Sequence, residues 1–233
     1  DEELVILARY SDQLLPTKLM LPDLKYVESM LDKLLMARYL EKECIPVPLT
    51  FPLNEDFLDI SYPCIVKPRK GRGSRGVKVF NTRDEVLSFK KTMGLSAKDF
   101  IVQNKINGQE YTVQMAANEN GQLSAVVPVK VGIKQGITIS AEVENEVNVI
   151  EACRLIHQSC PTKGCYNVQL ILTDNNVVMP FEINPRISTT YCLVVAANVD
   201  PIEIFLGKNY LDELVLFTPG VKLRRRWHNY FSN

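Results

Sequence analysis

Residues 179–188 read MPFEINPRIS, at the end of a strand-like apolar run. Side chains of a strand alternate between its two faces, so Glu182 and Asn184 are predicted to point the same way. A strand that needed only a buried face would alternate apolar with bland polar residues. Paired oxygen-bearing side chains instead suit a hard cation such as Mg²⁺. This stretch therefore predicts a strand that presents metal ligands.

A preceding strand supplies a third oxygen. The segments YNVQLILT and VVMPFEI are joined by the turn residues DNN, which predicts a hairpin. Folding over that turn would bring Gln169 beside Glu182 and Asn184. Three oxygen ligands together with nucleotide phosphates fit Mg²⁺, which takes few protein ligands and completes its shell with phosphate and water. The alternative is an edge strand with ordinary exposed polar residues.

Basic residues and glycines alternate earlier in the chain, within KPRKGRGSRGVK. The basic positions are Lys67, Arg69, Lys70, Arg72, Arg75 and Lys78, and the glycines are Gly71, Gly73 and Gly76. Glycines let backbone N–H groups approach an anion, and a lysine at the end of a strand adds a fixed charge. The pattern suits phosphate, although it matches neither a P-loop nor a dinucleotide-binding fingerprint. A solvated basic turn and an RNA-contacting loop remain alternatives.

Composition limits the possible classes of protein. The 233 residues are 46% hydrophobic, enough to bury a full core, and Lys plus Arg equals Asp plus Glu at 27 each. This balance argues against a partner that is nucleic acid or a membrane surface. The six cysteines show no metal-ligand spacing, and Cys64 and Cys192 lie in apolar runs that predict core positions. No apolar run is long enough to span a membrane, and we expect a cytoplasmic protein.

The order of predicted elements gives an α+β fold with two sheet-bearing lobes. Helices are predicted over 29–43, 83–92 and 147–159, and a capping box of Thr82 and Glu85 starts the second. A further short helix is predicted to start with Asp200 as its cap and Pro201 as its first residue. Strands are predicted over 62–68, 77–80 and 100–103, then in a hairpin over 108–131, and in the pair described above. The alternation of Tyr111, Val113 and Met115 with polar residues predicts one buried face.

The two ends of the chain carry separate expectations. DEELVILARYSDQL begins inside a helix-like pattern without a cap, so we expect an upstream domain to be missing or truncated, with 1–28 as its remnant or a linker. We expect one lobe over 29–106, a second over 107–220 and a basic tail over 221–233. The RRRWH segment of the tail favours a packed or solvated terminus over a nucleic-acid contact. His157 and His228 are predicted to be structural or exposed.

Five segments in order resemble a known family. They are YPCIVKP, the glycine-rich loop, FIVQNKINGQEYTV, NVQLIL and FEINPR. Together they resemble the ATP-grasp superfamily over about residues 29–210, most of all its carbamoyl-phosphate-synthetase-like branch. Each motif alone is weak, and the ordered set is specific. The resemblance implies two α/β lobes whose antiparallel sheets clasp ATP.

The resemblance also implies roles for individual residues. Lys33 and Lys67 would hold phosphates, Arg186 would face the transferred phosphoryl group, and Gln169, Glu182 and Asn184 would bind the metal. The loop from Lys70 to Gly76, including Gly73 and Ser74, would close over the triphosphate. The residues Gln103, Asn104 and Ile106 would form the hinge that reads adenine, and Glu110 would bind ribose. Ser188, Thr189 and Tyr191 follow the metal strand, where relatives bind the acceptor substrate.

The activity implied is an ATP-dependent ligase that joins a carboxylate to an amine or thiol through an acyl phosphate. ATP and Mg²⁺, or Mn²⁺ in its place, would be cofactors, small-molecule carboxylates and amines would be substrates, and a homodimer is left open. Two departures matter: Gln169 stands where many relatives have a carboxylate, and Lys134 lies where the synthetase carries a histidine segment. Phosphorylation of a small carboxylate or carbamate, a non-catalytic ATP-binding module and a basic-loop RNA binder are alternatives.

Overall fold

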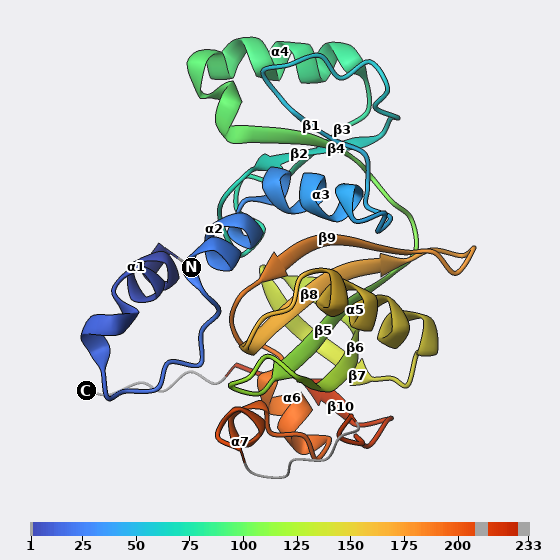
Figure 1. The fold of residues 1–233 in the computed structure, drawn as a ribbon. Helices are drawn as coiled ribbons and strands as arrows, with labels where there is room; N and C mark the ends of the chain where they lie inside the picture. The colour runs from blue at the N-terminus through green and yellow to red at the C-terminus, as the bar shows by residue number, and fades with distance from the viewer. Residues whose placement is uncertain (1, 208–213, 228–233) are drawn as a thin grey trace, which may run out of the picture.

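Two antiparallel sheets in separate lobes organise the computed structural model, which describes residues 2–207 and 214–227 (Figure 1). The predicted α+β class is confirmed. The smaller sheet has four strands in the order β1-β4-β2-β3, and the larger has six in the order β10-β7-β6-β5-β8-β9. Residues 105–108 connect β4 of the first sheet to β5 of the second, so the chain passes directly between the lobes there.

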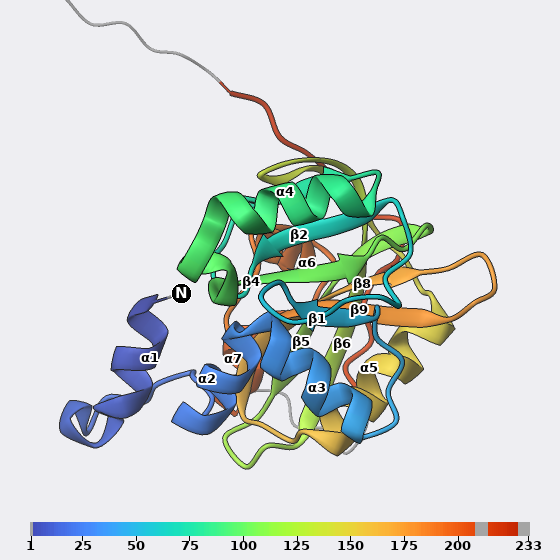
Figure 2. The same ribbon diagram turned by 90° about the horizontal axis from the view of Figure 1, so that it is seen from above.

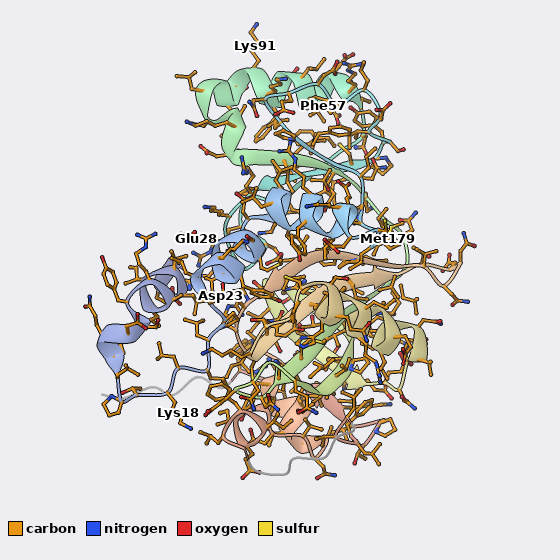
Figure 3. The ribbon with its side chains drawn as sticks, viewed as in Figure 1. Lys18, Asp23, Glu28, Phe57, Lys91 and Met179 are labelled. Carbon is orange, nitrogen blue, oxygen red and sulfur yellow. The ribbon has the colours of Figure 1, made fainter. Side chains whose placement is uncertain are left out.

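The small lobe contains β1 (Thr50–Pro52), β2 (Cys64–Pro68), β3 (Lys78–Phe80) and β4 (Phe100–Asn104), with α4 (Arg83–Met93) and the 3₁₀ turn η2 (Gly94–Asp99). The capping box is confirmed: the Thr82 hydroxyl accepts from the Glu85 N–H, and the Glu85 carboxylate accepts from the Thr82 N–H. Helix α4 runs along the outer face of the sheet (Figure 2). Phe57, labelled in Figure 3, is buried in the apolar core of this lobe.

The large lobe contains β5 (Gln109–Ala117), β6 (Leu123–Gln135), β7 (Ile137–Val143), β8 (Gly164–Leu172), β9 (Val178–Asn184) and β10 (Lys222–Arg224). Helix α5 (Val147–Ser159) covers one face of its sheet, and α6 (Tyr191–Ala196) and α7 (Pro201–Phe205) lie on the other side (Figure 1). The predicted helix over 147–159 is confirmed at both ends, because its apolar positions recur at helical spacing.

Strand β5 shows how the sheet separates its two faces. Tyr111, Val113 and Met115 belong to the core beneath α5, as the alternation predicts. The expectation of a single buried face was wrong, because Thr112 and Gln114 on the opposite face are buried too. That second face is enclosed by the other lobe at one end and by α6 at the other, so Thr112 lines an interior space and the Gln114 oxygen accepts from the Ser188 N–H at 3.2 Å.

The predicted helix over 29–43 was wrong in its boundaries, because two helices meet there: α2 (Leu24–Leu31) and α3 (Lys33–Lys42). Asp32 interrupts them with an extended backbone, and its carboxylate caps α3. The pattern of apolar residues runs through the break and therefore hid it. Upstream, α1 (Glu2–Arg9) and the 3₁₀ turn η1 (Ser11–Leu14) pack beside α2, away from the sheets (Figures 1 and 2).

The structure also places two cysteines, the start of the C-terminal tail and one histidine for which the sequence made predictions. Cys64 is buried as predicted, whereas Cys192 is exposed, because it lies on the outer side of the short helix α6. The basic tail is a strand over its first part, since β10 pairs with β7. His157 is structural as predicted: its ring nitrogens contact the Tyr166 hydroxyl at 2.8 Å and the Gly121 carbonyl at 2.9 Å. Residues 228–233, which include His228, lie outside the described residues.

No helix in the described ranges combines the length and the apolar character needed to cross a membrane.

Candidate functional site

A cavity of about 520 Å³ lies between the two sheets. The end of β2 and the glycine-rich loop form one side, and β8 and β9 form the other. The connection from β4 to β5 closes one end. The loop and the turn between β6 and β7 approach closely, since a Cβ atom on Gly136 would lie 3.7 Å from the Gly73 carbonyl oxygen. Segments distant in sequence thus meet around one interior space.

The lining of this cavity is strongly cationic. Its basic side chains are Lys33, Lys67, Arg72, Arg75, Lys105, Lys134 and Arg186. The carboxylates among the described lining residues are those of Glu110 and Glu182. Because a cleft with low-dielectric walls focuses the field of such charges, the cavity favours a polyanionic ligand.

Lys33 enters the cavity from the first turn of α3. Its side chain is only 8% exposed, and its ammonium donates to the Gly71 carbonyl at 3.2 Å and lies 3.9 Å from a Glu182 oxygen. One ammonium therefore contacts both the glycine-rich loop and the strand that was predicted to bind metal. A buried lysine is stable there because these oxygens compensate for the lost water.

Lys67, near the end of β2, faces Lys33 across the same space. Its ammonium lies 3.5 Å from the Phe181 carbonyl oxygen and 5.1 Å from the centre of the Phe181 ring. Burial lowers the pKa of Lys67 from its ordinary 10.5 to about 8, and the nearby Glu182 carboxylate opposes this shift. An anion brought into the cavity would raise that pKa again, so ligand binding and protonation of Lys67 should be coupled.

Lys134, on β6, bridges two residues of the predicted site. Its ammonium forms a short hydrogen bond to the Glu110 carboxylate and donates to the Gln169 side-chain oxygen at 3.0 Å. It also lies 5.9 Å from the centre of the Phe181 ring. The sequence drew attention only to the neighbourhood of Lys134, and the pairing of strands reveals its contacts.

The predicted metal ligands come from paired positions of β8 and β9. Gln169 is the register partner of Glu182, and Asn167 is the partner of Asn184. Gln169 and Glu182 line the cavity, as does Asn167, which the sequence reasoning missed. Asn184 is buried beside the cavity, and its amide donates to the Asn167 oxygen at 3.3 Å. The structure therefore brings the three predicted ligands together, with Asn184 the deepest.

The donor atoms of this cluster offer little negative charge to a divalent ion. Nowhere in the described ranges do three His, Cys, Asp or Glu side chains gather closely enough to hold a metal. The cluster offers one carboxylate, from Glu182, and amide oxygens. Such a set is too weak for an ion held by protein alone, but it fits Mg²⁺ delivered with phosphates that supply most of the ligands.

A β-bulge shapes the wall opposite Lys67. Between β8 and β9 the register shifts, so that Gln169 pairs with Glu182 while Leu170 pairs with Pro180. Phe181 is the extra residue. Consecutive residues of a regular strand point to opposite faces, but Phe181 and Glu182 both line the cavity. The bulge therefore adds an aromatic ring to the polar face, which strand alternation could not predict.

The end of the cavity near the β4–β5 connection is more apolar. Gln103, Asn104 and Ile106, which the resemblance assigns to a hinge, line it together with Ile65 and Ile171. The side chain of Gln103 is buried, and its amide donates to the Thr50 hydroxyl at 2.7 Å. This end offers apolar surface and backbone polar groups with the cationic side chain of Lys105, while the other basic side chains of the lining come from other segments.

Arg186 and the loop after β9 form the remaining wall. Burial lowers the pKa of Arg186, and the Glu182 carboxylate acts in the opposite direction. Ser188 and Thr189 line the cavity. Tyr191 lies outside the lining, and its hydroxyl donates to Asp200 at 2.8 Å. Here the wall is polar and cationic.

Most of the predicted site residues line the cavity: Lys33, Lys67, Gly73, Ser74, Gln103, Asn104, Ile106, Glu110, Gln169, Glu182 and Arg186. Lys70, Gly76 and Asn184 are absent from that lining among the described residues. Lys70 and Gly76 belong to the two ends of the glycine-rich loop, whose central residues face the cavity. Thr112, Asn167 and Phe181 were missed, since they become recognisable only through strand pairing.

These features define a two-lobed protein whose sheets enclose a site for a polyanion. The model of the ATP-grasp domain family matches residues 30–190, and the chain belongs to that family. The predicted superfamily and fold are confirmed.

Similar sequences agree with the predicted branch. The chain is 25% identical over 206 residues to the carbamoyl phosphate synthase large chain of Lachnoclostridium phytofermentans, a match that covers 81% of this chain and 19% of that protein. It is 27% identical over 175 residues to the large chain of a Thermoanaerobacter species, covering 67% of this chain and 16% of that protein. The chain thus spans less than a fifth of the length of these relatives.

Solved structures share the fold at low sequence identity. Carboxyaminoimidazole ribonucleotide synthase from Aspergillus clavatus, complexed with ATP, superposes with a TM-score of 0.73 at 14% identity, covering 91% of this chain and 59% of that one. Biotin carboxylase from Campylobacter jejuni gives 0.73 at 15%, covering 90% and 53%. L-amino acid ligase from Bacillus licheniformis gives 0.69 at 15%, covering 87% and 52%.

Proposed function

We propose that the chain binds ATP with Mg²⁺ in the cavity between its sheets and activates a carboxylate for ligation to an amine or a thiol. The observation that carries this proposal is the convergence of Lys33, Lys67 and Arg186 on Glu182. These residues come from three separate segments, α3, β2 and β9 with the residues directly after it, and line one cavity. A cationic site beside the Glu182 carboxylate suits a nucleoside triphosphate that brings its own metal.

The two ends of the cavity suit different parts of the nucleotide. The adenine would lie against Ile65, Ile171 and Phe181, with backbone groups of Gln103 to Ile106 at its edge. Glu110 would accept from the ribose hydroxyls. Lys33, Lys67 and the glycine-rich loop would contact the phosphates, since phosphoryl transfer depends mainly on positioning and on neutralising charge.

Glu182, Gln169 and Asn184 would hold Mg²⁺, which when bound draws negative charge from the β- and γ-phosphates. A carboxylate oxygen of the substrate would attack the γ-phosphorus, the bond to the β-phosphate oxygen would break, and ADP would leave. Arg186 and Lys33 would stabilise the charge of the transferring group. The amine would then attack the acyl carbon, and phosphate and a proton would be released. No side-chain nucleophile is required.

Phosphate release tests the proposal. The wild-type protein would be incubated with Mg²⁺-ATP and pools of carboxylates plus amines, and a parallel sample would contain hydroxylamine, which converts an acyl phosphate to a stable hydroxamate. We expect release that depends on the pool and a hydroxamate product. Glu182→Ala should reduce both by at least about 100-fold. The control Glu151→Ala, on the exposed face of α5, should match the wild type.

Two results would contradict the ligase: silence across broad pools, or release that survives Glu182→Ala. Binding of ATP without turnover would favour a non-catalytic module. Binding of RNA with steep salt dependence and no ATP affinity would favour the basic-loop alternative.

A further inference from the structure

The break between α2 and α3 buries a carboxylate. Asp32 is 3% exposed, and one of its oxygens accepts from the Leu34 N–H at 3.1 Å and the Leu35 N–H at 3.4 Å. Helix caps are commonly Ser, Thr, Asn or Asp, and the first three satisfy the backbone N–H groups without a charge. A buried charge is costly unless it is paired, so capping alone does not account for an aspartate here.

The partner of Asp32 is Arg69, at the root of the glycine-rich loop. The Arg69 guanidinium donates from Nε to one Asp32 oxygen at 3.1 Å and from Nη2 to the other at 2.8 Å. This is a two-pronged contact, which fixes orientation as well as distance. The side chain of Arg69 is 28% exposed and that of Asp32 is 4% exposed, so the pair is largely shielded from water.

Backbone bonds extend this contact to both neighbouring segments. The Lys33 N–H donates to the Arg69 carbonyl at 3.0 Å, and the Arg69 N–H donates to the Asp99 carbonyl at 2.9 Å. Lys33 directly follows Asp32, and Lys67 lies two residues before Arg69. One ion pair therefore fixes the backbones that carry both lysines of the proposed phosphate end.

Neither Asp32 nor Arg69 is among the residues that line the cavity. Both act on it through their neighbours. Lys33, the residue after Asp32, donates from its ammonium to the Gly71 carbonyl at 3.2 Å. Without a clamp, the cationic loop and the cationic end of α3 would repel each other. The pair opposes that separation at the point where the loop leaves β2.

We propose that Asp32 and Arg69 are positioning residues that hold Lys33 and the root of the glycine-rich loop in register for the nucleotide phosphates. This inference rests on the proposed function. It predicts an effect that is specific to the phosphates, because the pair borders the phosphate end of the cavity and not the end near the β4–β5 connection. Breaking the pair should weaken binding of ATP and leave binding of adenosine unchanged.

Calorimetric titration of ATP and of adenosine into four variants tests this difference between the two ligands. Asp32→Asn keeps an oxygen for the helix cap and loses the charge, and Arg69→Gln removes the fork. Both should weaken ATP binding about tenfold while adenosine binding stays within about twofold of the wild type. Arg69→Lys should recover part of the loss. The control Asp56→Asn removes an exposed ion pair of the same lobe, 3.5 Å from Arg83, and should change neither ligand.

A double-mutant cycle tests whether Asp32 acts through Lys33. Lys33→Met alone should weaken ATP binding, and adding Asp32→Asn should then cost less than about twofold. Full additivity, or equal losses of ATP and adenosine, would overturn the inference and leave the proposed function intact.

A measurement without nucleotide tests the Asp32–Arg69 contact independently of the proposed function. If the wild type bound no ATP, the proposed function would fail, and the phosphate role of the pair would fail with it. Tryptic cleavage within 70–75 would still report on the clamp: we expect faster cleavage of Asp32→Asn and Arg69→Gln than of Asp56→Asn. Equal cleavage rates would show that the pair does not anchor the loop.

Discussion

Gln169 and Glu182 face each other as register partners across β8 and β9, and Lys134 donates to the oxygen of Gln169. The neutral member of this pair is thus held by a cation, while the charged member lies 3.9 Å from Lys33. The balance of charge around the pair should decide how strongly a divalent ion is retained.

Changing the charge of either partner should shift the metal requirement in opposite directions. Glu182→Gln removes the one carboxylate of the proposed set of metal ligands, so the Mg²⁺ concentration for half-maximal turnover should rise about tenfold or more. Gln169→Glu adds a carboxylate, and that concentration should fall about tenfold. Titration of Mg²⁺ at fixed ATP measures both. A shift in the same direction for the two variants would show that these side chains do not hold the metal.

Nucleotide affinity should depend on pH through Lys67. Its pKa in the free protein is lowered to about 8 by burial, and bound phosphate would raise it. Binding then takes up a proton above pH 8, so ATP affinity should be constant below pH 8 and fall by up to about tenfold per pH unit above it. Titrations from pH 7 to pH 9.5 measure this. Lys67→Arg keeps the charge and should flatten the profile; a wild-type profile that is already flat would contradict the role.

Arg225 should influence the side of the cavity that we propose binds the acceptor substrate. Its guanidinium donates from Nε to the Thr138 carbonyl at 2.9 Å and forms a short hydrogen bond to the Thr189 carbonyl, so it connects β7 to the loop after β9. Arg225→Gln should raise the acceptor concentration needed for half-maximal phosphate release about tenfold and leave the KM for ATP unchanged. Arg224→Gln, on the exposed side of β10, is the control. An equal change in the half-maximal acceptor concentration and in the KM for ATP would show that Arg225 supports the whole cavity and not one side of it.

His157 should make stability depend on pH. Burial lowers its pKa below the ordinary 6.5, so below about pH 6.5 the unfolded chain binds more protons than the folded one. The stabilisation is present above pH 6.5 and should be lost as the pH falls below it, by up to about 1.4 kcal/mol per pH unit until the folded protein also takes up the proton. Denaturant unfolding at pH 7 and pH 5 measures the difference. In His157→Gln that difference should shrink, and an unchanged difference would assign the effect to other groups.

The sequence by itself determined the local elements and their order. The capping box of Thr82 and Glu85 needs only residues three apart, and the helix over 147–159 needs only its own apolar spacing. The Gln169–Glu182 pairing was also predictable, because a short turn leaves two adjoining strands few registers. The ordered motifs then indicated the family, which the family model confirms.

Only the tertiary structure decided how the site is assembled. Asp32 interrupts an apolar pattern that continues through it, because its carboxylate meets an arginine 37 residues away. The bulge turns Phe181 into the cavity, and Lys134 reaches Gln169 from a strand that is not its neighbour. Such contacts depend on where distant segments pack, and no local spacing or propensity encodes that information.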